Sequence, residues 1–83
     1  MKRSEIIERL REIMLDADSR NAPQIENCGE DSKLMTDLGF SSVGMLYMVI
    51  AIEESFGVMF ENVSIGDFET VGDVVDYLEK KLP

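Results

Sequence analysis

The sequence has no histidine and no tryptophan, one cysteine and two prolines in its 83 residues. Histidine is the usual general base and metal ligand near neutral pH, so its absence removes the commonest catalytic and metal-binding chemistry. Cys28 cannot form an internal disulfide or a cysteine zinc cluster alone, and it has no histidine to activate it. We interpret Cys28 as a reduced, non-catalytic thiol of a cytosolic protein.

Basic residues are also scarce, with 8 lysines and arginines against 17 acidic residues and a net charge of −9. Nucleic-acid binding needs a basic surface, so we expect no nucleic-acid partner. The charge favours basic protein partners reached by electrostatic steering, although simple solubility would explain it too. No apolar run has the length of a membrane span, and the N-terminus lacks the apolar region of a signal peptide. We therefore expect a cytoplasmic protein.

The acidic stretch that begins at Asp16 does not fit a calcium-binding loop. An EF-hand loop needs alternating oxygen ligands, a central glycine and a glutamate at its last position. Here Arg20, Asn21 and Asn27 occupy the third ligand position, the glycine position and the glutamate position. We expect no metal site and, because no acid–base pair is apparent, no enzyme.

Apolar residues recur at helical spacing in three segments. The first runs from about residue 4 to residue 16, with Ser4 as its expected N-cap. The last follows a capping box at residues 70–73 and ends in two lysines, which suit the negative end of the helix dipole. Two charged pairs are spaced to meet on the outer face of the first helix: Glu5 with Arg9 and Glu8 with Arg11. The expected core stripes of these two helices are Ile6, Leu10, Ile13 and Met14, widened by Ile7, and Val71, Val74, Val75, Leu78 and Leu82.

The central helix is expected from Ser42 to Phe56, closed by glycine, and it is apolar on more than one side. Its core stripe is Met45, Met48, Val49, Ile52 and Phe56. A second row consists of Val43, Tyr47 and Ile50 and ends at Glu54. A helix apolar nearly all round is normally buried, but a domain this small cannot easily cover every side. The second row is therefore expected either to be buried or to dock a partner.

Two connectors join the three helices. The first, from about residue 16 to 36, is long and polar, with Asn21, Pro23, Asn27 and Gly29 as breakers. A short helical turn after Ser32 should bring three apolar side chains to the core: Leu34, Met35 and Leu38. The second connector is irregular, with one short turn carrying Ile65 and Phe68. The pattern predicts one all-α domain over residues 1–83, a small four-helix bundle of three main helices plus one short helix, with a long first connector.

The start of the central helix, Gly39-Phe40-Ser41-Ser42, is the candidate functional site. Glycine permits a tight turn that leaves the second serine at a helix start, where free N–H groups and the dipole favour a phosphate. With no histidine, and no lysine between Lys33 and Lys80, Ser42 has no base to make it a nucleophile. A serine modified by another enzyme fits better than a catalytic serine.

At this point the sequence resembles the acyl carrier protein family over nearly its whole length. The resemblance rests on Asp37-Leu38-Gly39-x-x-Ser42, on the apolar helix ending in Ala51-Ile52-Glu53-Glu54-Ser55-Phe56-Gly57, and on the segment from Thr70 to Leu78. It implies that Ser42 carries a 4'-phosphopantetheine arm, donated from coenzyme A by a phosphopantetheinyl transferase. It also implies that the arm holds acyl groups as thioesters and carries them between acyl-loading and acyl-processing enzymes, and that the bundle shelters part of the acyl chain. The protein would then be a monomeric carrier without catalysis of its own.

The sequence departs from the family pattern at two places. The family usually has aspartate before the modified serine, and here Ser41 stands there, so two adjacent hydroxyls are candidates, of which the alignment favours Ser42. The family's central helix usually presents acidic side chains to its partners, whereas this one keeps only Glu53 and Glu54. The expected partner-docking residues are Val43, Gly44, Tyr47, Ile50, Glu53 and Glu54. An apolar face of this kind favours a dedicated carrier for polyketide or lipid-type biosynthesis over general fatty-acid synthesis.

Gly44 lies in the first turn of the central helix, where glycine costs about 1 kcal/mol relative to alanine. It indicates either tight packing against a neighbouring helix or room for another group beside Ser42. Two alternatives to an acyl carrier remain: an aminoacyl or peptidyl carrier, which shares the same turn and bundle, and an acidic helical interaction module in which Ser42 only caps the helix.

Overall fold

The computed structural model describes residues 2–61 and 64–82, with the side chain of Ile65 left out. Within those residues it has four α-helices: α1 (Arg3–Ala17), α2 (Ala22–Glu26), α3 (Ser42–Phe56) and α4 (Val71–Lys81). Two single 3₁₀ turns, η1 (Ser19–Asn21) and η2 (Ile65–Asp67), lie in the connectors. The β-type pairing found in the described part is an isolated antiparallel bridge between Lys33 and Thr70. The predicted small all-α bundle is confirmed.

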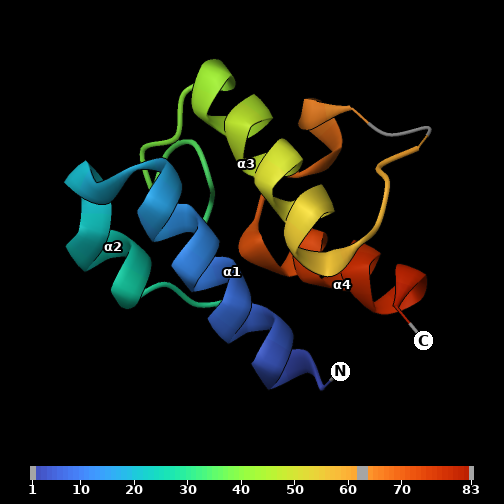
Figure 1. Ribbon diagram of the computed structural model, residues 1–83. Coiled ribbons are helices and arrows are strands. Elements are labelled where there is room, and N and C mark those ends of the chain that lie inside the picture. The colour runs from blue at the N-terminus through green and yellow to red at the C-terminus, as the bar shows by residue number, and fades with distance from the viewer. Residues whose placement is uncertain (1, 62–63, 83) are drawn as a thin grey trace.

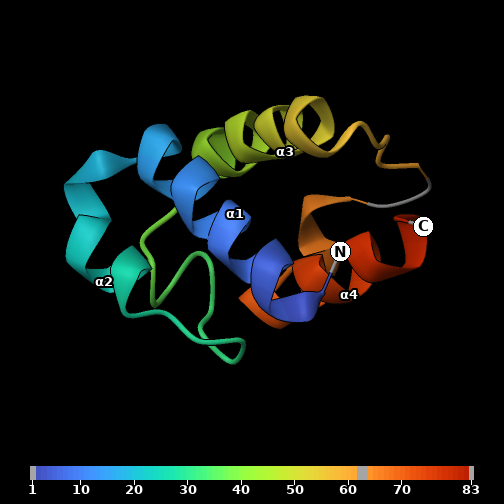
Figure 2. The same cartoon turned by 60° about the horizontal axis from the view of Figure 1, so that its bottom comes forward.

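Helix α1 is the element that the others surround. It contacts α2, α3 and α4, and Figures 1 and 2 show α3 and α4 on one side of it and α2 on the other. The expected stripes form the core: Ile6, Leu10, Ile13 and Met14 of α1, Met45, Met48 and Ile52 of α3, and Val71, Val74, Val75 and Leu78 of α4 are buried. Val49, Phe56 and Leu82, at the edges of these stripes, are half-buried. None of the helices in the described residues is both long and apolar enough to cross a membrane.

The bounds of α3 and α4 match the sequence signals. Helix α3 ends at Gly57, whose φ of 68° is left-handed and suits glycine. At the start of α4 the Thr70 hydroxyl accepts from the Asp73 N–H at 3.2 Å, and the Asp73 carboxylate accepts from the Thr70 N–H at 3.0 Å. Both bonds of the predicted capping box therefore form, and Lys80 and Lys81 lie in the last turn as expected.

The predicted N-cap of α1, Ser4, is wrong. The helix begins at Arg3 and not after Ser4, because the Glu5 carboxylate accepts a hydrogen bond from the Lys2 N–H at 3.0 Å. Glutamate at the third helical position reaches back to the residue before the helix, so Lys2 is the N-cap.

The first connector holds a helix that the sequence did not predict. Residues 22–26 form α2, with Pro23 in its first turn, where a proline has no N–H to leave unpaired. After Ser32 the chain makes a hydrogen-bonded turn and not a helix, since the N–H groups of Asp37 and Leu38 both donate to the Lys33 carbonyl at 3.0 Å. The short helix of the bundle therefore lies earlier in the chain than we predicted.

Two of the three apolar residues expected to contact the core after Ser32 do so. Leu34 and Leu38 are buried, but Met35 is 47% exposed, so that part of the prediction is wrong. In the second connector the short turn exists as η2 and Phe68 is buried. The predicted contact of Ile65 lies outside the described side chains. Cys28 is buried in the core and forms no disulfide.

The two ion pairs predicted along α1 do not form in the described residues. Arg9 instead lies with its guanidinium 5.4 Å from the centre of the Phe56 ring, and Arg11 donates to the Cys28 carbonyl at 2.7 Å. Both side chains tie α1 to neighbouring segments, where backbone carbonyls without helical partners are available. The consequence is that the acidic side chains of α1 are left without those cations.

Arg3 is the other cation of α1, and it connects three segments. Its guanidinium pairs with Glu30 in the first connector and with Asp76 and Glu79 of α4. These carboxylates raise the pKa of Arg3, and Arg3 in turn lowers the pKa of Glu30. The pairs are exposed to solvent, so they position the N-terminus of α1 and add little to stability.

Candidate functional site

The turn before α3 requires glycine for two reasons. Gly39 has φ of 77°, which L side chains rarely adopt, and a Cβ there would lie 2.9 Å from the side-chain nitrogen of Asn21. The next residue, Phe40, is buried and its N–H donates to the Leu34 carbonyl at 3.0 Å. The buried Phe40 therefore anchors the turn, and the next two residues, Ser41 and Ser42, lie at the start of α3.

The two serines have different roles in this structure. Ser41 is the N-cap: its hydroxyl accepts from the Gly44 N–H at 3.1 Å, and its carbonyl accepts from the Met45 N–H at 2.9 Å. Ser42 is the first residue of the helix and is exposed, and its hydroxyl makes no hydrogen bond to any described residue. Ser42 therefore offers the accessible hydroxyl, whereas the hydroxyl of Ser41 is engaged in holding the helix.

The surroundings of Ser42 suit an anion. The first four N–H groups of a helix have no partner within it, and Ser41 takes up only that of Gly44. The N–H groups of Ser42 and Val43 remain free of protein partners among the described residues. The first turn of α3 has no acidic residue, unlike those of α1 and α4, so no carboxylate competes at the positive end of the dipole.

Gly44 packs tightly, but against the turn before its own helix and not against a neighbouring helix, which was one of the two alternatives. A Cβ at this position would lie 3.3 Å from the Phe40 ring and 3.5 Å from the Ser41 hydroxyl. Alanine would therefore press on the same turn that presents Ser42. The glycine is explained by the turn before its own helix.

The second apolar row of α3 is exposed, so the alternative that this row is buried is wrong. Val43 is 75% exposed, Tyr47 62% and Ile50 56%. Leu46, 53% exposed, shares this face, although we did not single it out; its spacing of three from Val43 and four from Ile50 was the available signal. We call Val43, Leu46, Tyr47 and Ile50 the apolar strip.

The two glutamates predicted for docking differ in exposure and in their contacts. Glu54 is exposed, four residues beyond Ile50 on the same face. Glu53 is half-buried and its carboxylate accepts from the Phe60 N–H at 2.9 Å. Glu53 therefore holds the chain that leaves α3 and does not belong to the strip.

The described core side chains around Leu10 and Met48 are closely packed. The gap among the core side chains has no room for a water molecule, and it is lined by Leu10, Met14, Leu34, Met48, Val71 and Val74. The predicted shelter for an acyl chain would therefore require these side chains to move, which unbranched methionines permit more readily than branched residues. The described residues also contain no group of three histidine, cysteine or carboxylate side chains that could hold a metal ion.

Comparison with known proteins gives one consistent result. A family model described as "Phosphopantetheine attachment site" matches residues 8–78. An acyl carrier protein of Thermotoga maritima is 34% identical over 80 residues, which cover 96% of this chain and 95% of the relative. The chain belongs to the acyl carrier protein family. Acyl carrier proteins of Sinorhizobium fredii and Wolinella succinogenes are 35% and 31% identical, over 93% and 89% of this chain and 95% and 93% of their own lengths.

Membership identifies the chain as a carrier and not an enzyme, with phosphopantetheine as its prosthetic group. It disfavours the alternative of an interaction module without a prosthetic group. The residues at the start of α3 fit such a group, because they combine an exposed hydroxyl, free N–H groups and no nearby carboxylate in the first turn. The carrier role also implies a phosphopantetheinyl transferase and biosynthetic enzymes as partners.

Proposed function

We propose that Ser42 carries the 4'-phosphopantetheine arm and that the protein delivers acyl intermediates to successive enzymes. The observation that carries this proposal is the difference between the two serines: the hydroxyl of Ser41 caps α3, and that of Ser42 is exposed without a partner. When bound, the arm supplies a terminal thiol that holds acyl groups as thioesters.

The chain's own residues contribute position and electrostatics. Gly39 sets the turn, Ser41 fixes the first turn of α3, and the N–H groups of Ser42 and Val43 would hold the phosphate of the arm. No base in the chain is needed, because the transferase supplies the chemistry of attachment. This explains how an acidic chain without histidine can have a functional serine.

The apolar strip supports a dedicated set of partner enzymes. Where the family usually presents carboxylates, this helix presents exposed aliphatic and aromatic side chains next to the attachment site. Such a face matches partners with an apolar patch and excludes those that rely on charge alone. We therefore favour a specialised polyketide or lipid-type pathway over general fatty-acid synthesis. The relatives named acyl carrier protein favour an acyl cargo over an aminoacyl or peptidyl one.

The site assignment can be tested by mass spectrometry after co-expression with a broad-specificity phosphopantetheinyl transferase. The wild type and Ser41→Ala should gain the mass of the arm, and Ser42→Ala should not, because only Ser42 offers an exposed hydroxyl. Gain of the arm by Ser42→Ala would show that the assignment is wrong. No gain in any variant, with a known carrier modified in parallel, would contradict the carrier function itself.

The cargo can be read from the protein isolated from its native cell, where intact mass spectrometry would detect the arm and any attached acyl group together. A cytoplasmic monomer remains our expectation for its location and state, and fractionation and light scattering would check them.

A further inference from the structure

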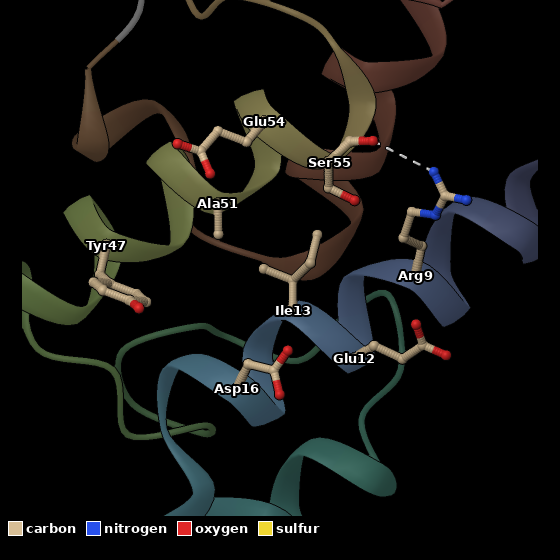
Figure 3. Close-up of a pocket in the computed structure, with 8 residues that line it drawn as sticks. All are labelled: Arg9, Glu12, Ile13, Asp16, Tyr47, Ala51, Glu54 and Ser55. Atoms are coloured by element: carbon tan, nitrogen blue, oxygen red, sulfur yellow. Dashed lines mark hydrogen bonds between the residues drawn. The ribbon is translucent and has the colours of Figure 1, made fainter.

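Asp37 is an exposed residue in the turn before Ser42, and its contacts differ from those of exposed carboxylates elsewhere around α3. Three of those carboxylates line a groove between α1 and α3 and accept no hydrogen bond from a described residue: Glu12, Asp16 and Glu54 (Figure 3). The carboxylate of Asp37 instead accepts from the N–H of Lys33 at 2.8 Å. It is therefore engaged within its own segment of the chain.

Lys33 and Asp37 are joined by hydrogen bonds in both directions. The Lys33 N–H donates to the Asp37 carboxylate, and the Asp37 N–H donates to the Lys33 carbonyl at 3.0 Å. Among the described residues, the Asp37 carboxylate is the one partner of the Lys33 N–H. Loss of this carboxylate would leave that N–H to solvent, and the turn would keep only its backbone bonds.

The segment before the turn is fixed to the start of α4. Two N–H groups of the first turn of α4, which have no partner within the helix, donate to carbonyls of the connector at 3.0 and 2.8 Å. The second is that of Gly72, where a Cβ would lie 3.1 Å from the Glu30 carbonyl, so glycine permits the close approach. In return, the Leu34 N–H donates to the Glu69 carbonyl at 2.9 Å. The turn therefore starts from a fixed base.

The segment after the turn is bonded back to the same base. The Leu38 N–H donates to the Lys33 carbonyl and the Phe40 N–H to the Leu34 carbonyl, each at 3.0 Å. Residues 33–40 thus form one hydrogen-bonded turn, and Ser42 follows two residues after Phe40. Loosening of the turn would therefore change how the Ser42 hydroxyl is presented.

The contact of Asp37 requires an acceptor oxygen and not a negative charge. The Lys33 ammonium pairs with Glu69 at 3.6 Å, and Asp37 has no ion pair with a described residue. Its carboxylate meets the backbone of Lys33 and not the cation. Asparagine offers an acceptor oxygen on a side chain of the same length. It could replace Asp37 in this contact, but not in binding to a partner that recognises charge.

We propose that Asp37 is a positioning residue for attachment of the arm: through the Lys33 N–H it holds the turn that presents the Ser42 hydroxyl to the transferase. This rests on the proposed function, because it takes Ser42 as the attachment site. The transferase then meets the hydroxyl in one preformed position, so less ordering of the turn is needed on binding. An exposed carboxylate near the site thereby acts on its own chain and not on the basic surface of a partner.

The kinetics of transfer from coenzyme A by a broad-specificity phosphopantetheinyl transferase would test this role. Asp37→Ala should raise the KM for the carrier roughly two- to tenfold, with little change in kcat, because affinity falls with the fraction of molecules in the competent form. Asp37→Asn should keep KM within about twofold of the wild type, because it retains the acceptor. Asp31→Ala is the matched control: it removes the same charge from an exposed residue of the same connector that has no hydrogen bond from its carboxylate to a described residue, and KM should change less than about twofold.

Hydrogen exchange of the unmodified protein gives a second readout that needs no transferase. The Lys33 amide should exchange faster in Asp37→Ala than in Asp37→Asn or the wild type, while the amides of α1 and α4 keep their rates. An effect on global stability alone would instead speed exchange throughout the helices and leave KM unchanged. An unchanged rate at Lys33 in Asp37→Ala would contradict the contact itself.

Three kinetic results would overturn the inference. A rise in KM as large for Asp37→Asn as for Asp37→Ala would show that the transferase recognises the charge, and an equal rise for Asp31→Ala would show a general effect of net charge. A KM for Asp37→Ala within about twofold of the wild type would show that the turn does not need the contact. In each case the wild type still gains the arm, so the proposed function stands. If the wild type gains no arm while a known carrier does, the proposed function fails and this role of Asp37 fails with it.

Discussion

Alanine substitutions at the two adjacent serines should have opposite effects on stability and on modification. Ser41→Ala removes the hydroxyl that accepts from the Gly44 N–H at 3.1 Å, and loss of such a cap costs about 1 kcal/mol. Because α3 contributes Met45, Met48 and Ile52 to the core, the loss should destabilise the whole domain. In a domain of this size, 1 kcal/mol corresponds to a fall of roughly 4–8 °C in Tm.

Ser42→Ala should change the free energy of unfolding by less than about 0.5 kcal/mol, because no hydrogen bond to a described residue is lost. Thermal and urea unfolding followed by circular dichroism would measure both variants. Ser41→Asp is the matched control, since aspartate also caps helices and suits the positive end of the dipole. The assignment would be refuted if Ser41→Ala were neutral, or if Ser42→Ala were the more destabilising change.

Two further predictions concern α3 and the N-terminus of α1. Because Ile50 is 56% exposed, Ile50→Glu should leave the free energy of unfolding nearly unchanged and block acyl loading. Ile52 is fully buried, so Ile52→Ala should lower the free energy of unfolding by about 2–5 kcal/mol. Equal destabilisation of the two variants in urea would contradict the exposed strip. Arg3 lowers the pKa of Glu30, so the ionised carboxylate stabilises the fold above the ordinary pKa of glutamate, and this is lost as the pH falls through the lowered value. Urea unfolding at neutral and acidic pH should therefore show a smaller acid loss in Glu30→Gln, and an unchanged pH dependence would contradict the pairing.

The helices could be predicted where local signals were strong. Ser42 to Phe56 was expected and observed as α3, because a serine cap, a long apolar run and a closing glycine agree. Helix α2 was missed because five residues carry no periodicity, and Pro23 acts as a breaker only beyond the first turn. Ser4 was wrongly predicted as the N-cap of α1, because the Glu5 carboxylate accepts from the Lys2 N–H and the helix begins one residue earlier.

For the candidate site, the sequence predicted the turn before α3 but not which of the two serine hydroxyls caps the helix. Both Ser41 and Ser42 satisfy the preference for serine at a helix start, and only coordinates show which hydroxyl meets the Gly44 N–H. The sequence could not show that a Cβ at Gly44 would press on the Phe40 ring. The contact of Arg9 could not be predicted either. Its spacing from Glu5 indicates an ion pair, but the sequence does not show that the Ser55 carbonyl of α3 lies within reach of its guanidinium.

Periodicity could not separate the two apolar faces of α3, because a docking face and a core face have the same spacing. The structure separates them by exposure, and the exposed face raises a physical question, since contiguous apolar surface favours association between copies. The net charge of −9 opposes that association, because two copies of the chain repel each other. On the proposed function, a partner must then be cationic and apolar at once. A purely basic enzyme would be attracted but would leave the strip uncovered, and a purely apolar one would gain nothing from the negative charge of the carrier. Selection would therefore come from the requirement for both features in one segment.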